Sequence, residues 1–559
     1  MKKPAGRLAR PYRIMWDQNH PYESMYNPPM APEMHGAGHL GYFVGTPVDA
    51  CTEGIGPDAG YVTAFPSQKT RMEYLVERYE RGATLGDVRY WRHAENLKRT
   101  WAAGHDPLGL QVEEAQRLGI DFWFRLSMND WHHVSNGKVY RLGGSRFYEE
   151  RTDLLIGEEG AAGWKDHPAT QSALTWMQDF AHEEVRALRR DIALEVCERY
   201  DCAGFVFDFI RIPGYFRYGE ERRNAHLLTQ MVRETRAGLD EIGRTKGREI
   251  GLAVRLPATV DGTRRLGIDI EDWIDDHLVD IVVTSPFFPQ DFEHDAAEWV
   301  ALARSSPVHL QAAIEEGYMA GHNDGHNRWW YDPPLMTPMS LDMVRGMAAR
   351  HHRAGVDGLY VFNWFGTLPT YDQDLVPALD EIADPERLRY LDKRYLVMRS
   401  TTSFPNCLET ERSLPLTITG DPAPLTFDIV DDVAGAGDVV HSVRLLLHVA
   451  NPTIADELEV RMEGPDGARA LPLANPMEPG VRQDPRTAWF IYDLRATPPR
   501  AGVNRFTVRA SRRNQRTADE LPLTVEDAEL EIAYEGSRIG RFPAHGATAD
   551  VPTLGLPVS

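Results

Sequence analysis

The sequence predicts an α/β fold, a (β/α)8 TIM barrel with long loop insertions, followed by a C-terminal all-β sandwich. The chain has 559 residues, which is too long for one ordinary domain but suits a barrel of about 250 residues, enlarged by loops, plus a smaller module. Apolar strands alternate with helical stretches up to about residue 385, and short alternating strands prevail from about residue 414 onward. We therefore expect a barrel catalytic domain over residues 1–395 and an ancillary β-sandwich over residues 396–559.

Eight apolar runs are expected to form the barrel strands. In chain order they cover residues 11–17, 119–125, 173–179, 204–208, 249–255, 279–285, 308–315 and 358–363. Helical stretches lie between them, and in residues 183–200 the apolar residues Val185, Leu188, Ile192 and Val196 recur every three to four positions, as on one face of an amphipathic helix. Eight strand-and-helix units are the number that closes such a barrel.

Two stretches, residues 20–109 and 131–170, are rich in Gly, Pro, His and aromatic residues and are expected to be long loops that form walls or lids. The C-terminal strands, for example over residues 442–449, 457–462 and 504–509, predict a sandwich. This module suits carbohydrate binding, but a brace between domains or an oligomer contact explains the same pattern, so we assign it no chemistry.

Composition excludes several classes of partner. The formal net charge of -22 argues against nucleic acid or an anionic membrane surface and favours a neutral substrate. The four cysteines are Cys51, Cys197, Cys202 and Cys407; they lack metal-ligand spacing and are expected to be reduced thiols. We find no signal peptide, no apolar run of about 18 residues and no nucleotide-binding motif. We therefore expect a cytoplasmic protein without a cofactor, of undetermined oligomeric state.

The segment 199–213 is the most informative. An apolar strand, Gly-Phe-Val-Phe, ends there in Asp208, followed by Arg211 and Pro213. A strand buried on both faces reads as a continuous apolar run, so a carboxylate at its C-terminal end needs a reason. In a barrel of this kind that end carries the catalytic groups. The alternative is a structural salt bridge between Asp208 and Arg211.

Residues 180–213 carry a resemblance to a known family. A helix feeds a strand of the pattern Gly-aliphatic-x-Phe-Asp-Phe-x-Arg-x-Pro, which resembles the glycosyl-hydrolase-like barrels called family-10-like, distant relatives of the α-amylase-type barrels. The resemblance covers roughly residues 10–385. It implies carbohydrate chemistry, with Asp208 as the nucleophile and Arg211 in the matching downstream position.

Hydrolysis of a glycosidic bond needs a second carboxyl group. The seventh expected strand ends in Glu315 and Glu316. Adjacent residues of a strand point to opposite faces, so at most one of them faces the cleft directly, and we favour Glu315 as the general acid. In amylase-type relatives the acid would come from the fifth strand, which here ends at Arg255 and Pro257 without a carboxylate.

Other polar and aromatic residues follow the expected strands and are predicted to bind the sugar, because barrels assemble their sites from several strand ends. They are Asp17, His20, Arg125, Asn129, Asp130, His132, Asp179, Arg211, Arg255, Trp329, Trp330, Asn363 and Trp364. The tryptophans offer stacking faces, and Arg125 or Arg255 suits a uronate or sulfate on the substrate. Each also has an ordinary structural explanation, an ion pair or loop packing.

Two alternatives stay open. His132, His133, His322 and His326, with Asp324, suggest a metal-dependent barrel hydrolase, although the first strand lacks the His-x-His of amidohydrolases and we predict no metal. A non-catalytic carbohydrate-binding protein on a barrel scaffold is the second, since the fifth strand carries no acid.

Overall fold

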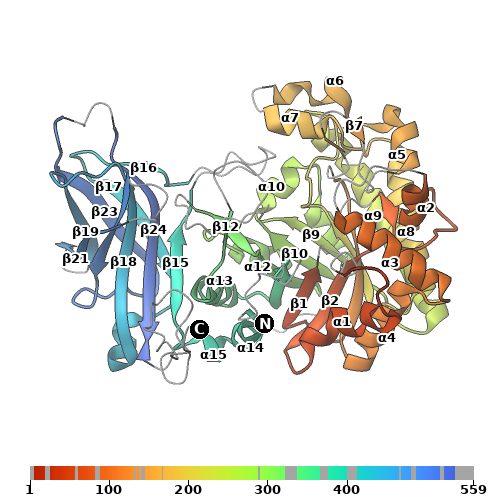
Figure 1. The fold of residues 1–559 in the computed structure, drawn as a ribbon, viewed down its shortest axis with the longest axis horizontal. Helices are drawn as coiled ribbons and strands as arrows, with labels where there is room; N and C mark the ends of the chain where they lie inside the picture. The colour runs from red at the N-terminus through yellow and green to blue at the C-terminus, as the bar shows by residue number, and fades with distance from the viewer. Residues whose placement is uncertain are drawn as a thin grey trace, which may run out of the picture.

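The computed structural model describes residues 6–18, 26–56, 61–81, 88–130, 134–135, 138–139, 145–165, 168–286, 290–320, 336–364, 375–399, 412–464, 467–479, 486–516 and 521–535. Among them, eight parallel strands close into a barrel (Figure 1). These strands are β1 (Ile14–Gln18), β2 (Val48–Gly54), β5 (Asp121–Ser127), β8 (Gly204–Asp208), β9 (Gly251–Pro257), β10 (Ile281–Ser285), β11 (His309–Ile314) and β14 (Gly358–Phe362). The predicted fold class is confirmed.

Two of the predicted strand assignments are wrong. The second barrel strand is β2, which lies inside the stretch 20–109 that we expected to be a loop, so residues 119–125 belong to the third strand, β5. The sequence of β2 contains Asp, Thr and Glu and lacks a long apolar run. Residues 173–179 are not a strand: they include the end of α7 (Pro168–Leu174), and their apolar side chains pack with Ile156. One strand before β8 was missed and one was predicted in error, so β8 is still the fourth barrel strand.

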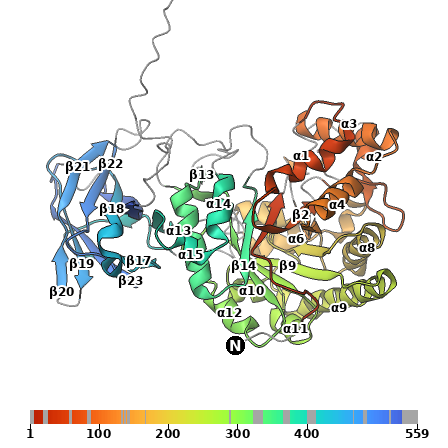
Figure 2. The same cartoon turned by 90° about the horizontal axis from the view of Figure 1, so that it is seen from below.

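Helices surround the barrel (Figures 1 and 2). The principal ones are α4 (Pro107–Leu118), α8 (Glu183–Arg199), α9 (Glu221–Lys246), α10 (Val260–Arg265), α11 (Ile270–Asp275), α12 (Ala297–Ala303), α13 (Leu341–Ala354) and α14 (Leu375–Ile382). In α8 the predicted face of Val185, Leu188, Ile192 and Val196 is buried. Asp106 caps the start of α4 by accepting hydrogen bonds from two backbone amides.

Further elements lie in the connections between the barrel strands and after α14. They are α1 (Ala37–Leu40), α2 (Leu75–Glu80), α3 (Val88–Ala102), α5 (Arg146–Glu150), α6 (Gly157–Ala161) and α15 (Pro385–Leu388), with the paired strands β3 (Val62–Thr63) and β4 (Glu73–Tyr74), β6 (Val134–Ser135) and β7 (Lys138–Val139), and β12 (Gly317–Met319) and β13 (Met336–Pro338). The stretches predicted as plain loops therefore contain helices and small sheets.

The barrel interior begins with an apolar layer. Trp123 of β5 lies within it, and the neighbouring strands β8 and β9 each place a glycine against its ring. A Cβ atom on Gly204 or on Gly251 would lie 2.3 Å from the indole, closer than real atoms approach, so the missing side chains make room for Trp123. This layer supports the polar residues that follow it along the strands.

The C-terminal part is built of antiparallel sheets. Six described strands form one sheet, β15 (Lys393–Val397), β16 (Leu416–Thr417), β18 (Val440–Ala450), β21 (Leu473–Pro479), β22 (Thr487–Asp493) and β24 (Thr524–Tyr534), and the second contains β17 (Ala423–Ile429), β19 (Glu457–Gly464), β20 (Gly467–Ala470) and β23 (Gly502–Arg512), with α16 (Val433–Ala436) between strands. Apolar residues from both sheets form one shared core.

The barrel and the C-terminal sheets meet at α13. This helix contacts β11 and β14 of the barrel on one side and β15 on the other, and both cartoon views show it between the two parts (Figures 1 and 2). Because β15 pairs with β24, the C-terminal sheet starts at residue 393, and the predicted boundary at residue 395 falls inside its first strand.

Two further expectations from the sequence concern the cysteines and the absence of a membrane-spanning helix. Of the four cysteines, Cys51, Cys197 and Cys202 are buried free thiols, whereas Cys407 lies outside the described residues. None of the described helices combines the length and the apolar character needed to cross a bilayer.

Candidate active site

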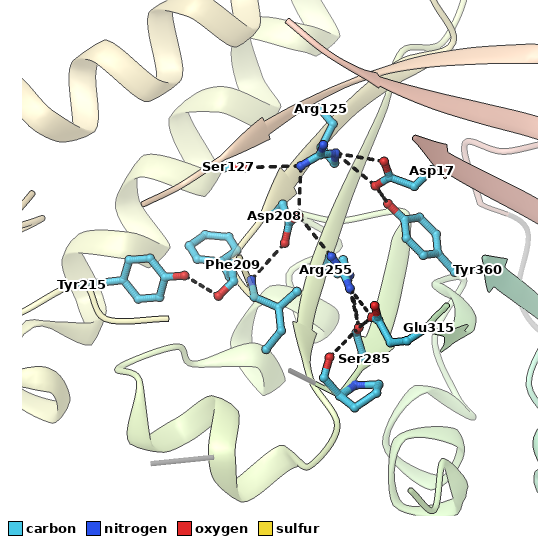
Figure 3. Close-up of polar contacts among 12 residues, drawn as sticks. Asp17, Arg125, Ser127, Asp208, Phe209, Tyr215, Arg255, Ser285, Glu315 and Tyr360 are labelled. Carbon is cyan, nitrogen blue, oxygen red and sulfur yellow. Dashed lines mark hydrogen bonds and ion pairs between the residues drawn. The ribbon is translucent and has the colours of Figure 1, made fainter. Parts of the chain in front are cut away.

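A charged layer lies directly above the apolar layer of the barrel, toward the C-terminal ends of the strands. Side chains that face the barrel interior recur every second residue, and on five strands an apolar residue is followed two positions later by a charged one. These pairs are Met15 and Asp17, Trp123 and Arg125, Val206 and Asp208, Ala253 and Arg255, and Ala313 and Glu315. The charged residues converge with Tyr360 (Figure 3). We call Asp17, Arg125, Asp208, Arg255, Glu315 and Tyr360 the mouth cluster.

Asp208 is the fully buried centre of this cluster. Its Oδ2 accepts hydrogen bonds from Nη1 of Arg125 at 3.1 Å and from Nη1 of Arg255 at 3.3 Å, and its Oδ1 accepts from the backbone amide of Ile210 at 3.0 Å. The suggested salt bridge to Arg211 is therefore wrong. The guanidinium of Arg211 lies over the ring of Phe362 instead, 5.5 Å from its centroid.

Glu315 follows β11 and is also fully buried. Its Oε1 accepts hydrogen bonds from Nη2 of Arg255 at 2.5 Å and from the hydroxyl of Ser285 at 3.0 Å, while its Oε2 is a buried oxygen without a hydrogen-bond partner in the structure. Burial raises the pKa of Glu315, and the nearby Arg255 and the Ser285 hydrogen bond oppose that rise. The carboxyl group therefore favours its protonated form more than a solvated glutamate does.

The neighbouring Glu316 is buried as well, and its backbone carbonyl accepts a hydrogen bond from the amide of Met339 at 3.0 Å. Of the two candidate acids, Glu315 is the one whose carboxyl group contacts Arg255. The alternation of strand side chains explains this choice, because Ala313 also faces the barrel interior and lies two residues before Glu315.

A second ion pair completes the cluster on the side of β1. Nε of Arg125 lies 3.0 Å from Oδ2 of Asp17, and the hydroxyl of Tyr360 donates a hydrogen bond to the same oxygen. Burial raises the pKa of Asp17, while Arg125 and the Tyr360 hydrogen bond oppose that rise. Arg125 thus holds two carboxylates, Asp17 and Asp208, and Arg255 holds Asp208 and Glu315.

Sequence reasoning missed Tyr360 and Ser285. Tyr360 lies inside the apolar run 358–363 that predicts the eighth strand, where a single tyrosine does not stand out. Ser285 ends β10 as Asp208 ends β8, so the rule that selected Asp208, a polar residue at the end of an apolar strand, would also have selected Ser285.

Three predicted site residues have other contacts. The side-chain amide of Asn129 donates to the carbonyls of Gln178 at 3.0 Å and Gly214 at 2.7 Å, so it ties separate loops together. Asp179 pairs with Arg217 at 3.3 Å and accepts a hydrogen bond from the amide of Ala181 at 2.9 Å, and burial raises its pKa. Asp130 is fully buried near these loops.

The remaining candidates follow the last barrel strand or lie outside the described residues. The backbone amide of Asn363, which has a positive φ of 61°, donates to the carbonyl of Asp17 at 3.0 Å. Trp364 is fully buried and its ring nitrogen donates to the carbonyl of Ile314 at 3.0 Å, so its face is not offered to a sugar in this structure. The candidates His20, His132, Trp329 and Trp330 lie outside the described residues.

A metal centre finds no support in the part of the chain that the structure describes, which contains no group of three or more His, Cys, Asp or Glu side chains arranged to hold an ion. The histidines of the metal hypothesis, at positions 132, 133, 322 and 326, lie outside those residues, as does Asp324.

No family model matches the chain, and no curated protein is significantly similar to it. Solved glycoside hydrolases show distant structural similarity. Chitinase ChiW from Paenibacillus sp. str. FPU-7 has a TM-score of 0.39 and 9% identity over 94% of this chain and 54% of its own, so this chain spans about half of that enzyme. α-L-Fucosidase isoenzyme 1 from Paenibacillus thiaminolyticus has a TM-score of 0.34 and 13% identity over 89% and 96% of the two chains. GH36 α-galactosidase AgaB from Geobacillus stearothermophilus has a TM-score of 0.33 and 12% identity over 91% and 56%. Similarity at this level concerns the fold alone.

Proposed function

We propose that the chain is a glycoside hydrolase that cleaves an O-glycosidic bond of an oligo- or polysaccharide with Asp208 and Glu315. The observation that supports this most directly is the shared arginine: Arg255 contacts Asp208 through Nη1 and Glu315 through Nη2. Two carboxyl groups from different strands thus lie on either side of one guanidinium. Glycosidases place their two carboxyl groups about 5 to 9.5 Å apart, on either side of the bond that is cleaved.

The two carboxyl groups have different environments, as the two roles require. Glu315 is the general acid: burial raises its pKa, and no group in the described part of the chain hydrogen-bonds its Oε2. Asp208 is the nucleophile or base: two guanidinium groups and a backbone amide stabilise its negative charge. Acid-assisted glycoside cleavage needs one carboxyl group that donates a proton and a second that attacks or activates water.

The arginines within the cluster have an internal role. Arg125 and Arg255 each bind two carboxylates, so their charges are already balanced, which weakens the idea that they recognise a uronate or sulfate. They hold the cluster's carboxylates in place. Arg211, which lies over Phe362 and near enough to Glu315 to influence its charge, is the better candidate for contact with substrate.

The test is a release assay on a broad panel of nitrophenyl glycosides and oligosaccharides. Asp208→Asn should abolish release that wild type shows. The matched control is Asp280→Asn, because Asp280 is also a buried, ion-paired carboxylate but lies at the opposite end of β10, with Arg236. Equal loss in both variants would point to a folding defect and contradict the assigned role. A chelator arm separates a metal hydrolase, since only that enzyme would lose activity on chelation.

A second candidate, a non-catalytic carbohydrate-binding protein, has one observation in its favour. Both oxygens of Asp208 already accept hydrogen bonds within the protein, and the side chain is fully buried. A purely structural ion network has these same properties. Binding of an oligosaccharide without release of product, unchanged in Asp208→Asn, would favour this candidate over the hydrolase.

A further inference from the structure

The loop that follows β10 holds the backbone on both sides of Glu315. Gln290 of this loop is fully buried. Its side-chain Oε1 accepts a hydrogen bond from the backbone amide of Glu315 at 2.8 Å, and its own backbone amide donates to the carbonyl of Gly317 at 2.8 Å. One residue therefore fixes the position from which the Glu315 side chain departs, in addition to the contacts that its carboxyl group makes.

The same loop is held from the C-terminal part of the chain. Arg412 lies between β15 and β16 and forms ion pairs with Asp291 and with Glu293, the latter at 3.1 Å. The backbone amide of Met398, at the end of β15, donates to the other oxygen of Glu293 at 2.9 Å. Two points of the connection between sheet strands thus bind the loop within three residues of Gln290.

Further hydrogen bonds join the residues between these two contacts. The side-chain amide of Gln290 donates to the carbonyl of Asp291 at 3.0 Å, and Oδ1 of Asp291 accepts from the amide of Glu293 at 2.9 Å. On the inner side the ring of His294 hydrogen-bonds the hydroxyl of Thr284 at 3.0 Å. Thr284 directly precedes Ser285, the residue that donates to the carboxyl group of Glu315. Residues 290–294 are therefore linked both to the Glu315 backbone and to the end of β10 that contacts its carboxyl group.

We propose that the C-terminal part positions the acid of the barrel: Arg412 holds the loop through Asp291 and Glu293, and Gln290 of that loop holds Glu315. This inference rests on the proposed glycosidase function for its catalytic meaning. Gln290 and Arg412 are positioning residues, since they act on the Glu315 backbone and not on substrate. A displacement of about 1 Å at a reacting group lowers rates by up to about 100-fold. The contacts from Arg412 through the loop to Glu315 therefore give the C-terminal part a direct role in turnover.

Hydrogen–deuterium exchange of the full chain tests the physical link without a substrate. Gln290→Ala and Arg412→Ala should each speed exchange in the peptide that contains Glu315, by about tenfold at its amide, because that amide loses a fixed acceptor or the loop that carries it. Exchange in the peptide that contains β8 should stay at the wild-type rate, which shows that the barrel is folded. Arg444→Ala is the matched control: it removes an ion pair with Glu531 in the C-terminal sheet, away from the loop, and should leave the Glu315 peptide unchanged.

Kinetics then test the catalytic meaning on any substrate that wild type cleaves. Arg412→Ala should lower kcat by about tenfold with KM changed by less than about twofold, and Arg412→Lys, which keeps the positive charge, should restore part of that loss. Wild-type exchange in Arg412→Ala, with faster exchange in Gln290→Ala, would overturn the link to the C-terminal part. Faster exchange with an unchanged kcat would overturn the positioning role. If wild type cleaves nothing in the panel, the glycosidase function fails. The exchange data still decide whether Arg412 and Gln290 hold the backbone of Glu315.

Discussion

Two clusters of buried charged residues differ in whether all of their charged atoms have hydrogen-bond partners. In the mouth cluster, Asp208 and Glu315 share Arg255, yet Oε2 of Glu315 has no hydrogen-bond partner among the described residues. The second cluster, which we call the tyrosine cluster, consists of Lys393, Tyr395, Asp431 and Tyr534 in the C-terminal part. Both clusters contain an ion pair whose members are almost wholly buried.

In the tyrosine cluster every charged atom has a partner. The ammonium of Lys393 donates to Asp431 at 2.8 Å and to two backbone carbonyls, and the two oxygens of Asp431 also accept from the hydroxyls of Tyr395 at 2.5 Å and Tyr534 at 2.6 Å. Fully satisfied buried networks stabilise a fold, while a buried polar atom left without a partner needs a separate explanation. The difference fits the structural role that we propose for the tyrosine cluster and the catalytic role that we propose for the mouth cluster.

The largest expected effect is a loss of activity on substitution of Glu315 in the mouth cluster. Glu315→Gln keeps the shape of the side chain and removes the transferable proton, so kcat on an oligosaccharide should fall by about 10²–10⁴-fold. Aryl glycosides whose leaving group departs without protonation should keep most of their rate, because their cleavage does not need the acid. Steady-state kinetics on both substrate types check this. Glu316→Gln is the comparison variant: a greater loss there would assign the acid to Glu316.

Substitution in the tyrosine cluster should lower stability and leave activity nearly unchanged. Lys393→Met leaves the carboxylate of Asp431 buried beside two hydroxyls without its cation, which should lower the free energy of unfolding by about 3–5 kcal/mol. Activity of the folded protein should stay near that of wild type, since Asp431 and the carbonyls of Arg389 and Leu391, which accept hydrogen bonds from the Lys393 ammonium, do not belong to the mouth cluster. Urea unfolding followed by circular dichroism measures the first effect. Lost activity at unchanged stability would contradict the assignment of the two clusters.

The pH dependence of stability should report the protonation of Glu315 in the mouth cluster. A carboxyl group with a raised pKa in the folded state binds its proton more tightly there than in the unfolded chain, so its stabilising contribution is complete below the ordinary pKa and is lost as pH rises through the raised one. Burial raises the pKa of Glu315 in this way. Wild type should therefore lose stability relative to Glu315→Gln as pH rises from about 4 to about 8. Thermal midpoints of the two proteins over that range test it, and parallel curves would show that Glu315 titrates normally.

The sequence predicted those parts of the fold that depend on local pattern. The strand that ends at Asp208 and the helix before it have strong apolar periodicity, and both formed as expected. The strand β2 was missed because its residues Asp49, Thr52 and Glu53 interrupt any apolar run, although all three are buried. Burial of polar residues depends on contacts from distant parts of the chain, such as the pairing of Asp49 with Arg13.

The partners within the candidate site were harder to predict for a related reason. Sequence proximity suggested Arg211 as the partner of Asp208, but the strand register places Asp208 directly beside Arg255. Register is a property of the closed barrel and leaves no mark in a single strand. The alternation of interior residues does leave one, because Asp17, Arg125 and Glu315 each follow an interior apolar residue by two positions. All five charged residues of the layer, which also include Asp208 and Arg255, were therefore among the candidates that the strand ends suggested.

The smallest expected effect concerns single hydroxyl groups. Tyr360→Phe removes a hydrogen bond to the buried Asp17, whose remaining ion pair is with Arg125, so the free energy of unfolding should fall by about 1–3 kcal/mol. Tyr492 of β22 is the matched control, since its hydroxyl is buried without a hydrogen-bond partner in the structure. Tyr492→Phe should be neutral or slightly stabilising, because the hydroxyl is desolvated in the fold without compensation. Urea midpoints of both variants measure the contrast. Equal losses would mean that ring packing dominates and that partnered and unpartnered hydroxyls cannot be told apart by stability.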